Sequence, residues 1–247
     1  IRRAYEKTGK QVVFLVDEYD APLLDSSGAP ELQEKLRNML RSFYSVVKMS
    51  DAMLRFVFIT GISKFSQMSI FSELNSLQNI SMQDRFSAIC GITQGEVEGQ
   101  LRPDVEALAQ KNGETYAEAL AHLKKMYDGY HFSPECEDIY NPFSLLNAFS
   151  NLDYDSYWFS SGTPTFLINL LRRSEFDIES LDSTEAPAEQ FDAPTEQECT
   201  PLPVLYQSGY LTIKSYDPVF RIYTLAYPNE EVRQGFISSL IPYYVND

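Results

Sequence analysis

The stretch KQVVFLVDEYDAPL, residues 10–23, joins five consecutive apolar residues to three acidic ones. The apolar run, Val12–Val16, is too short for a buried helix and is rich in β-branched residues, which predicts a strand covered on both faces, as in a parallel sheet. Asp17 and Glu18 follow it directly, and Asp20 is expected to cap or solvate the loop. The stretch therefore predicts a buried strand that ends in a pair of carboxylates.

A helix and a second strand follow this first strand. Pro30 is well placed in the first turn of a helix. Apolar residues then recur at steps of three and four, as on one face of an amphipathic helix, at Leu32, Leu36, Met39, Leu40, Phe43 and Val47. The stretch RFVFITG, residues 55–61, predicts a second apolar strand that ends at Thr60. Together these segments predict a βαβ unit, whose crossover is almost always right-handed.

The two strands would carry their polar ends to one edge of the sheet, where open parallel sheets bind ligands. There Asp17 would hold a Mg²⁺ ion through water, and the ion would neutralise nucleotide phosphates. Glu18 would polarise the attacking water, and Thr60 would sense the γ-phosphate, with Ser63 and Lys64 as alternatives. Composition alone favours a plain solvated loop after a buried strand. The helical crossover and the hydroxyl at the tip of the second strand favour the catalytic interpretation.

Composition restricts the classes of partner. The chain has 247 residues, 44% of them hydrophobic, and a net charge of −15, which opposes direct binding to nucleic acids or anionic membranes. It holds no apolar run of the roughly 20 residues that a membrane span needs. Three cysteines without a C-x-x-C pattern suit a reducing cytoplasm. The first ten residues resemble a helix entered midway, so we expect the chain to be a fragment.

The middle of the chain is predicted to be helical. Thr93 with Glu96, and Thr115 with Glu118, have the spacing of capping boxes at helix starts. The stretch DGYHF that follows the second of these helices is expected to be a packed turn, with its glycine as a positive-φ helix stop. We assign residues 93–173 to a helical lid.

The remaining boundaries follow from charge and turn signals. Residues 1–92 would form the core with the two strands. Residues 174–200 contain nine acidic residues and no basic one, which favours an exposed loop or linker, with a partner-binding segment as the alternative. Residues 201–247 read as a helix, a β-hairpin around residues 216–218 and a second helix, the order of a small winged-helix-like α+β module.

Six stretches, taken in order, resemble the bacterial AAA-ATPase-like family of P-loop proteins. They are VVFLVDEYDAPL, FVFITGISKFSQMSIFSELNSLQNIS, MYDGYHF, YNPFSLLNAF, YWFSSGTPTFLINLL and PLPVLYQSGYLTIK. That family is related to archaeal and STAND-type ATPases, and its members are often joined to a C-terminal PD-(D/E)XK nuclease-like domain. The resemblance implies an α/β fold with a RecA-like parallel-sheet core, incomplete at the N-terminus, followed by a helical lid and a winged-helix-like module. It also implies that Asp17 and Glu18 are the Walker B pair and that Thr60 is at the sensor-1 position.

One departure from the family pattern is large. The sequence contains no G-x-x-x-x-G-K-[ST] phosphate loop, which the family carries upstream of the position of Ile1. We therefore expect these residues alone to hydrolyse ATP poorly or not at all, and expect the intact protein to bind Mg²⁺ and ATP. Two alternatives to an ATPase that drives conformational change stay open: a nucleotide-controlled interaction switch of STAND type, and the regulatory ATPase of a DNA-directed nuclease-like effector.

Overall fold

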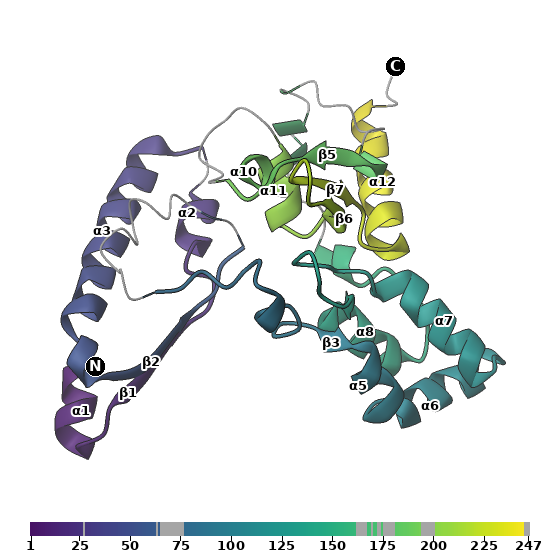
Figure 1. Cartoon of the computed structure of the whole chain (residues 1–247), viewed down its shortest axis with the longest axis horizontal. Helices are drawn as coiled ribbons and strands as arrows, with labels where there is room; N and C mark the ends of the chain where they lie inside the picture. The colour runs from purple at the N-terminus through teal and green to yellow at the C-terminus, as the bar shows by residue number, and fades with distance from the viewer. Residues whose placement is uncertain are drawn as a thin grey trace. The chain divides into compact units, whose positions relative to one another are not determined.

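The structure is a computed structural model, shown in Figure 1. It describes residues 1–26, 28–62, 64, 77–161, 167–168, 170–171, 174, 181–193 and 201–244. The chain divides into two compact units. The first comprises Ile1–Asn79 with Asp192–Cys199, and the second comprises Ile80–Phe191 with Thr200–Asp247.

The first unit contains the predicted strand–helix–strand arrangement. Its elements are α1 (Arg2–Thr8), β1 (Val12–Val16), α2 (Ala21–Asp25), α3 (Pro30–Met49), the 3-10 helix η1 (Asp51–Met53) and β2 (Leu54–Ile59). Strands β1 and β2 pair in parallel and lie side by side in Figure 1. Pro30 opens α3 as expected. The predicted βαβ unit is therefore confirmed.

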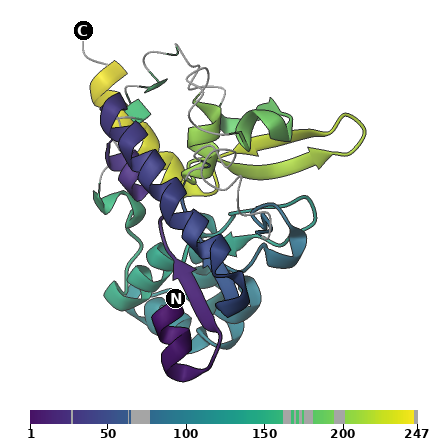
Figure 2. The same ribbon diagram turned by 90° about the vertical axis from the view of Figure 1, so that its left-hand side faces the viewer.

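Helix α3 covers one face of this small sheet, and Figure 2 shows it lying over β1. The core of the unit is built from Tyr19, Leu23, Tyr44 and Val47, with partly buried Phe14, Val16, Leu36, Leu40, Val57 and Ile59 packed against them. The opposite face is exposed: Val13 is 51% and Leu15 66% accessible. The prediction that β1 is covered on both faces is thus wrong for the described residues, because burial alternates along the strand.

The predicted apolar stripe of α3 is also only partly correct. Leu36, Leu40 and Val47 pack into the core as expected, together with Tyr44. Leu32, Met39 and Phe43, by contrast, are exposed. The helix therefore carries two adjacent apolar stripes, and the described residues bury only one of them.

The second unit begins with a helical part. Its elements are the 3-10 helix η2 (Asp84–Phe86), β3 (Ile92–Thr93), α5 (Gln94–Gly99), α6 (Arg102–Asn112), α7 (Tyr116–Tyr127), β4 (Ile139–Tyr140), α8 (Pro142–Asn151) and the 3-10 helix η3 (Trp158–Ser161). Both predicted capping boxes are present, at the start of α5 and of α7. Strands β3 and β4 form a short antiparallel pair. The prediction of a helical middle region is confirmed for the residues that the structure describes here.

A three-stranded antiparallel sheet occupies the C-terminal part of the second unit. Its elements are β5 (Thr184–Ala186), α10 (Ala188–Phe191), α11 (Leu202–Gln207), β6 (Thr212–Asp217), β7 (Ile222–Ala226) and α12 (Glu230–Tyr244). The strand order is β5-β7-β6, so the predicted hairpin is present as β6 and β7. The Asp217 carboxylate closes the turn by accepting the N–H groups of Val219 and Phe220 at 2.8 and 3.1 Å.

The acidic stretch supplies the third strand. Within residues 174–200, the described part 181–193 contains β5 and α10, and β5 pairs with β7. Leu181, Ala186 and Phe191 are fully buried in the core of the second unit. The prediction of an exposed loop or linker is therefore wrong for residues 181–193, because three apolar side chains anchor this otherwise acidic segment.

The DGYHF stretch joins the helical part to the hairpin and α12. Gly129 has a φ of 97°, and a Cβ there would clash with the backbone oxygen of Pro228. The Lys214 ammonium donates to the carbonyls of Gly129 and Pro228 at 3.1 and 2.9 Å. Asn229 donates to the carbonyl of Asp128 at 3.0 Å and also caps α12 by accepting the N–H of Val232. The predicted packed turn with a positive-φ glycine is confirmed.

Substitution of Gly129 should separate steric clash from backbone strain. Gly113, which ends α6 with a φ of 71°, has open space around it and supplies the matched control. We expect Gly113→Ala to cost about 1–2 kcal/mol for the left-handed backbone alone, and Gly129→Ala to cost roughly 1–3 kcal/mol more for the clash. Urea unfolding of both variants measures the difference. Equal losses in the two variants would contradict the close packing of the turn.

A buried carboxylate joins two further elements of this unit, α12 and η3. Glu231 of α12 is fully buried, and its Oε1 accepts the N–H of Trp158 at 2.9 Å. The ring of Phe159 lies where a side chain on Gly235 would have to be. Burial raises the pKa of the Glu231 carboxyl, and burial likewise raises the pKa of Asp128. Two carboxyl groups at the junctions of the unit are thus costly to ionise.

These raised pKa values predict how stability varies with pH. Between the ordinary carboxyl pKa and the raised one, the folded chain holds protons that the unfolded chain has released, so stability is lost as pH rises through that window. Glu231→Gln keeps an oxygen for the Trp158 N–H but removes the charge. We expect its stability to fall less than that of the wild type as pH rises above the ordinary carboxyl pKa of about 4, as measured by urea unfolding. Glu230→Gln, on the same helix, should keep the wild-type pH dependence, and identical profiles for Glu231→Gln and the wild type would contradict the assignment.

Candidate functional site

The carboxyl ends of β1 and β2 bring three of the predicted site residues together. The Thr60 hydroxyl donates to Oδ1 of Asp17, and the backbone N–H of Glu18 donates to the Thr60 hydroxyl oxygen at 3.3 Å. The backbones are joined as well, because the Thr60 N–H bonds to the Val16 carbonyl at 2.9 Å and the Tyr19 N–H bonds to the Thr60 carbonyl at 2.9 Å. Asp17, Glu18 and Thr60 therefore share one edge of the sheet.

An irregularity in the strand pairing sets this alignment. Val12 pairs with Leu54, but Val13 pairs with Phe56, so β2 contains one extra residue, Arg55. After this bulge Val16 pairs with Ile59, which puts Asp17 opposite Thr60. Regular pairing from Val12 onward would have put Thr60 opposite Glu18 instead. The bulge is at the start of the strands, and because it shifts the register of every later pair, it decides which side chains meet at their carboxyl ends.

The backbone changes direction at Glu18. Its φ of 51° is in the left-handed region, which is uncommon for a residue with a side chain and costs free energy. Asp17 and Glu18 on one side of this turn are exposed, whereas Tyr19 and Asp20 after it are buried. The turn thus leaves the first two carboxylates at the rim and directs the next two side chains inward.

Ser63 and Lys64 were predicted as alternatives to Thr60 for contact with phosphate. Ser63 lies outside the described residues, so its predicted cofactor-binding role stays a prediction. Lys64 forms an ion pair with Asp192, within the same unit. The structure therefore places the Lys64 ammonium against a carboxylate from the acidic stretch rather than against Asp17 or Glu18.

Sequence reasoning did not find the role of Asp20. Its side chain is fully buried and makes no capping hydrogen bond to α2, so the expectation that it caps or solvates the loop is wrong. Its Oδ1 instead accepts the N–H of Ile62 at 3.2 Å. The sequence contained one indication of this burial. Ala21-Pro22 is a plausible helix start, which leaves only the four residues Asp17–Asp20 to connect the strand to the helix. In so short a connection, one side chain has to turn inward.

The donor atoms at the rim suit a hard cation. Among the described residues, no group of three or more His, Cys, Asp and Glu side chains could hold a metal ion by itself. Mg²⁺ in nucleotide sites commonly takes only one or two carboxylates and completes its shell with water and phosphate oxygens. Asp17 and Glu18, exposed carboxylates at the end of a strand, fit that mode of binding.

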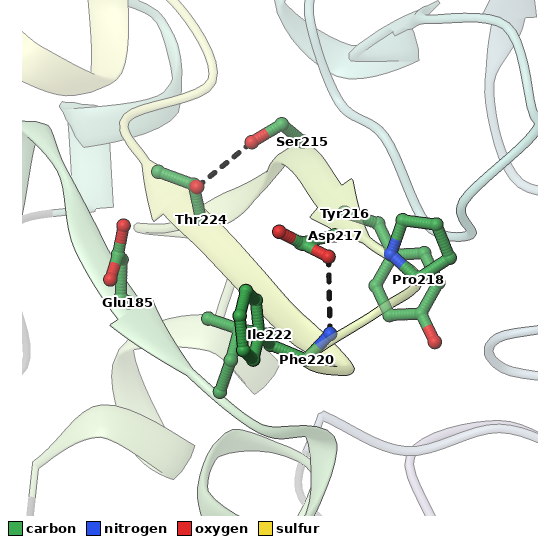
Figure 3. Close-up of a pocket in the computed structure, with 8 residues that line it drawn as sticks. All are labelled: Glu185, Ser215, Tyr216, Asp217, Pro218, Phe220, Ile222 and Thr224. Atoms are coloured by element: carbon green, nitrogen blue, oxygen red, sulfur yellow. Dashed lines mark hydrogen bonds between the residues drawn. The ribbon is translucent and has the colours of Figure 1, made fainter.

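A pocket of about 600 Å³ lies elsewhere, on the outer side of the β5-β7-β6 sheet (Figure 3). Figure 3 shows the hydroxyls of Ser215 and Thr224 bonded to each other, at 2.8 Å, and the Asp217 carboxylate accepting a backbone N–H of the hairpin turn. The other residues that line the pocket are Glu185, Tyr216, Pro218, Phe220 and Ile222. None of the predicted site residues in the described part of the chain lines this pocket.

Comparison with known proteins gives a family match over the N-terminal part of the chain. Residues 1–71, which include Asp17, Glu18 and Thr60, match the model of the AAA-ATPase-like family, described as predicted AAA-ATPase. The match supports an AAA-ATPase-like family, an ATPase-like function and the use of a nucleotide. No helix in the described part of the chain is long and apolar enough to cross a membrane.

A curated relative extends over nearly the whole chain. It is the "Uncharacterized protein in vnfD 5'region" of Azotobacter chroococcum mcd 1, which is 37% identical over 247 residues. The alignment covers 99% of this chain but 46% of the relative, so the chain spans less than half of the relative's length. No solved structure matches the chain.

The Thr60 hydroxyl should contribute measurably to the stability of the first unit. Thr60→Val keeps the shape of the side chain but removes both the donor to Asp17 and the acceptor for the Glu18 N–H. We expect a loss of about 1 kcal/mol in urea unfolding, because the bonds are exposed to water. Thr60→Ser, which keeps the hydroxyl, should stay closer to the wild type. A serine variant no more stable than the valine variant would show that the hydroxyl does not hold the loops together.

Proposed function

We propose that the first unit contributes the Mg²⁺ and water side of an ATP site, in a P-loop ATPase that couples ATP binding and hydrolysis to conformational change. The observation that carries this proposal is the shared edge of β1 and β2, where Asp17 and Glu18 meet the hydroxyl of Thr60. The family match over residues 1–71 supports it independently. The RecA-like core, the helical lid at residues 93–173 and the winged-helix-like module at residues 201–247 are parts of the same proposal.

Each residue has a distinct role in this proposal. Asp17 would hold the Mg²⁺ ion, and Glu18, exposed beside it, would position the attacking water and accept its proton. Bound Mg²⁺ would supply neutralising charge for the phosphates. Thr60 senses the γ-phosphate, with Ser63 as a further phosphate contact. These 247 residues contain no G-x-x-x-x-G-K-[ST] loop, so the proposal assigns no residue of this chain to the phosphate-binding loop.

The Thr60 hydroxyl has a property that suits a sensor. A hydroxyl carries a single hydrogen to donate, and here that hydrogen goes to Oδ1 of Asp17. A phosphate oxygen at the same edge would compete with Asp17 for it. The presence of the γ-phosphate would thereby change the hydrogen bonding of the carboxylate that orients the metal.

The hairpin supports a packing role rather than DNA binding. Lys214 and Arg221 are the basic residues of the β6–β7 hairpin, and the Lys214 ammonium is held by the carbonyls of Gly129 and Pro228. A DNA-binding wing needs several free cationic side chains that reach phosphates. This arrangement argues against direct DNA contacts by the hairpin, and a protein is the kind of partner that we propose for this module.

The test of the proposed function is Glu18→Gln in the full-length natural protein. We expect the turnover number for ATP to fall by about 10²–10⁴-fold, because the amide cannot accept a proton from water, while ATP affinity stays unchanged. Phosphate release and equilibrium binding of a fluorescent ATP analogue measure the two quantities. Asp25→Asn, an exposed acid in α2, is the matched control and should behave as the wild type. Wild-type turnover in Glu18→Gln would refute the assignment of Glu18.

A further inference from the structure

The proposed function leaves one buried charge of the first unit without a role. Asp20 is fully buried, although a carboxylate taken out of water costs several kcal/mol unless other groups compensate it. It does not cap α2, at whose N-terminus its backbone lies. A buried acid in this position, three residues after Asp17, therefore requires an explanation in what it contacts.

One group that the Asp20 carboxylate contacts is the backbone just after the sensor residue. The Ile62 N–H donates to Asp20 Oδ1 at 3.2 Å, two residues beyond Thr60. The Thr60 carbonyl and hydroxyl are bonded to Tyr19 and Glu18. The segment Thr60–Ile62 is thus bonded to the loop after β1 through the Thr60 carbonyl, the Thr60 hydroxyl and the Ile62 N–H, and the Ile62 N–H bonds to the Asp20 carboxylate.

Gly61 allows these two segments to approach each other. A Cβ on Gly61 would lie 2.7 Å from Asp20 Oδ1 and closer still to the ring of Tyr19, so no side chain fits between them. Its backbone therefore packs directly on Tyr19 and Asp20. Close packing of this kind transmits a displacement of one segment to the other, because neither has free space to move into.

Asp20 also acts electrostatically on α3. Tyr44 of α3 is buried in the core of the first unit, and its pKa is raised to about 12, first by burial and second by the negative charge of Asp20. The pKa of the Tyr44 phenol therefore serves as a reporter of the negative charge at Asp20.

We infer that Asp20 is a positioning residue: it fixes the Thr60–Ile62 segment, and through it the Thr60 hydroxyl, relative to Asp17. This inference rests on the proposed function, since a position matters to catalysis only if Thr60 senses phosphate. The carboxylate itself touches no reacting atom in this scheme. Its effect is exerted through the backbone of Gly61 and Ile62.

The structural part of the test needs no nucleotide. In the full-length protein, Asp20→Ala removes the acceptor of the Ile62 N–H, and we expect the Ile62 amide to exchange with deuterium at least about tenfold faster. Asp20→Asn keeps an oxygen and should keep most of that protection.

A second readout is the pKa of Tyr44. Both variants should lower it from about 12, because they remove the negative charge of Asp20. NMR of the tyrosine Cζ carbons measures this pKa, and Tyr44→Phe identifies the Tyr44 signal. Asp25→Ala should change neither signal.

The catalytic part of the test separates positioning from general damage. We expect Asp20→Ala to lower kcat for ATP by about 10–100-fold with an unchanged KM, and Asp20→Asn to recover most of the rate. Wild-type kcat in Asp20→Ala would overturn the inference. So would equal losses of kcat in both variants together with equal losses of stability in urea, since that pattern is expected of a purely structural residue.

Failure of the proposed function would look different. A wild-type full-length protein that neither binds nor hydrolyses ATP would refute the ATPase proposal, and with it the catalytic meaning of Asp20. The exchange of Ile62 and the Tyr44 pKa would still report whether the carboxylate holds the segment. If both also remain unchanged in Asp20→Ala, the contact itself is refuted.

Discussion

The site depends on the register in which β1 and β2 pair. Parallel strands end at the same edge, but only their register decides which side chains meet there. The extra residue Arg55 shifts the pairing by one position, so that Val16 lies opposite Ile59 and the next residues, Asp17 and Thr60, come together. The hydrogen bond between these two side chains, the bond from Glu18 and the contact of Asp20 with Ile62 all follow from this alignment.

The sequence was sufficient for the βαβ unit and for placing Asp17, Glu18 and Thr60 at one edge of the sheet, because both follow from strand type and strand direction. It did not show that Asp17 rather than Glu18 lies opposite Thr60, because the bulge decides that register. The sequence did not show which faces of strand β1 are buried. The run Val12–Val16 is apolar throughout, so periodicity cannot distinguish a strand covered on one face from one covered on both. The bulge at Arg55 has no sequence signature, since its cause is the pairing of two strands that are distant in the chain.

Charge was a misleading guide in two places. In residues 181–193 the acidic side chains suggested solvent, yet Leu181, Ala186 and Phe191 anchor the segment, and a few apolar side chains outweigh the many charges that stay in water. Asp20 was assigned to the loop surface by the same reasoning. It is buried because the connection from β1 to α2 is short and the Ile62 N–H offers it a hydrogen bond.

The bonds at the rim have a fixed direction, and this direction bears on how the site would respond to phosphate. A backbone N–H can only donate, so the Glu18 N–H makes the Thr60 oxygen an acceptor and leaves its one hydrogen for Asp17. A carboxylate can only accept, so the order Glu18, Thr60, Asp17 cannot reverse while Asp17 is ionised. An anion that accepts the hydrogen bond of the Thr60 hydroxyl must therefore replace Oδ1 of Asp17 as its partner. Asp20 binds the Ile62 N–H, and the Gly61 backbone packs on Tyr19 and Asp20, so the backbone after Thr60 is held in place. The hydroxyl can therefore respond by rotation, without displacement of the strand.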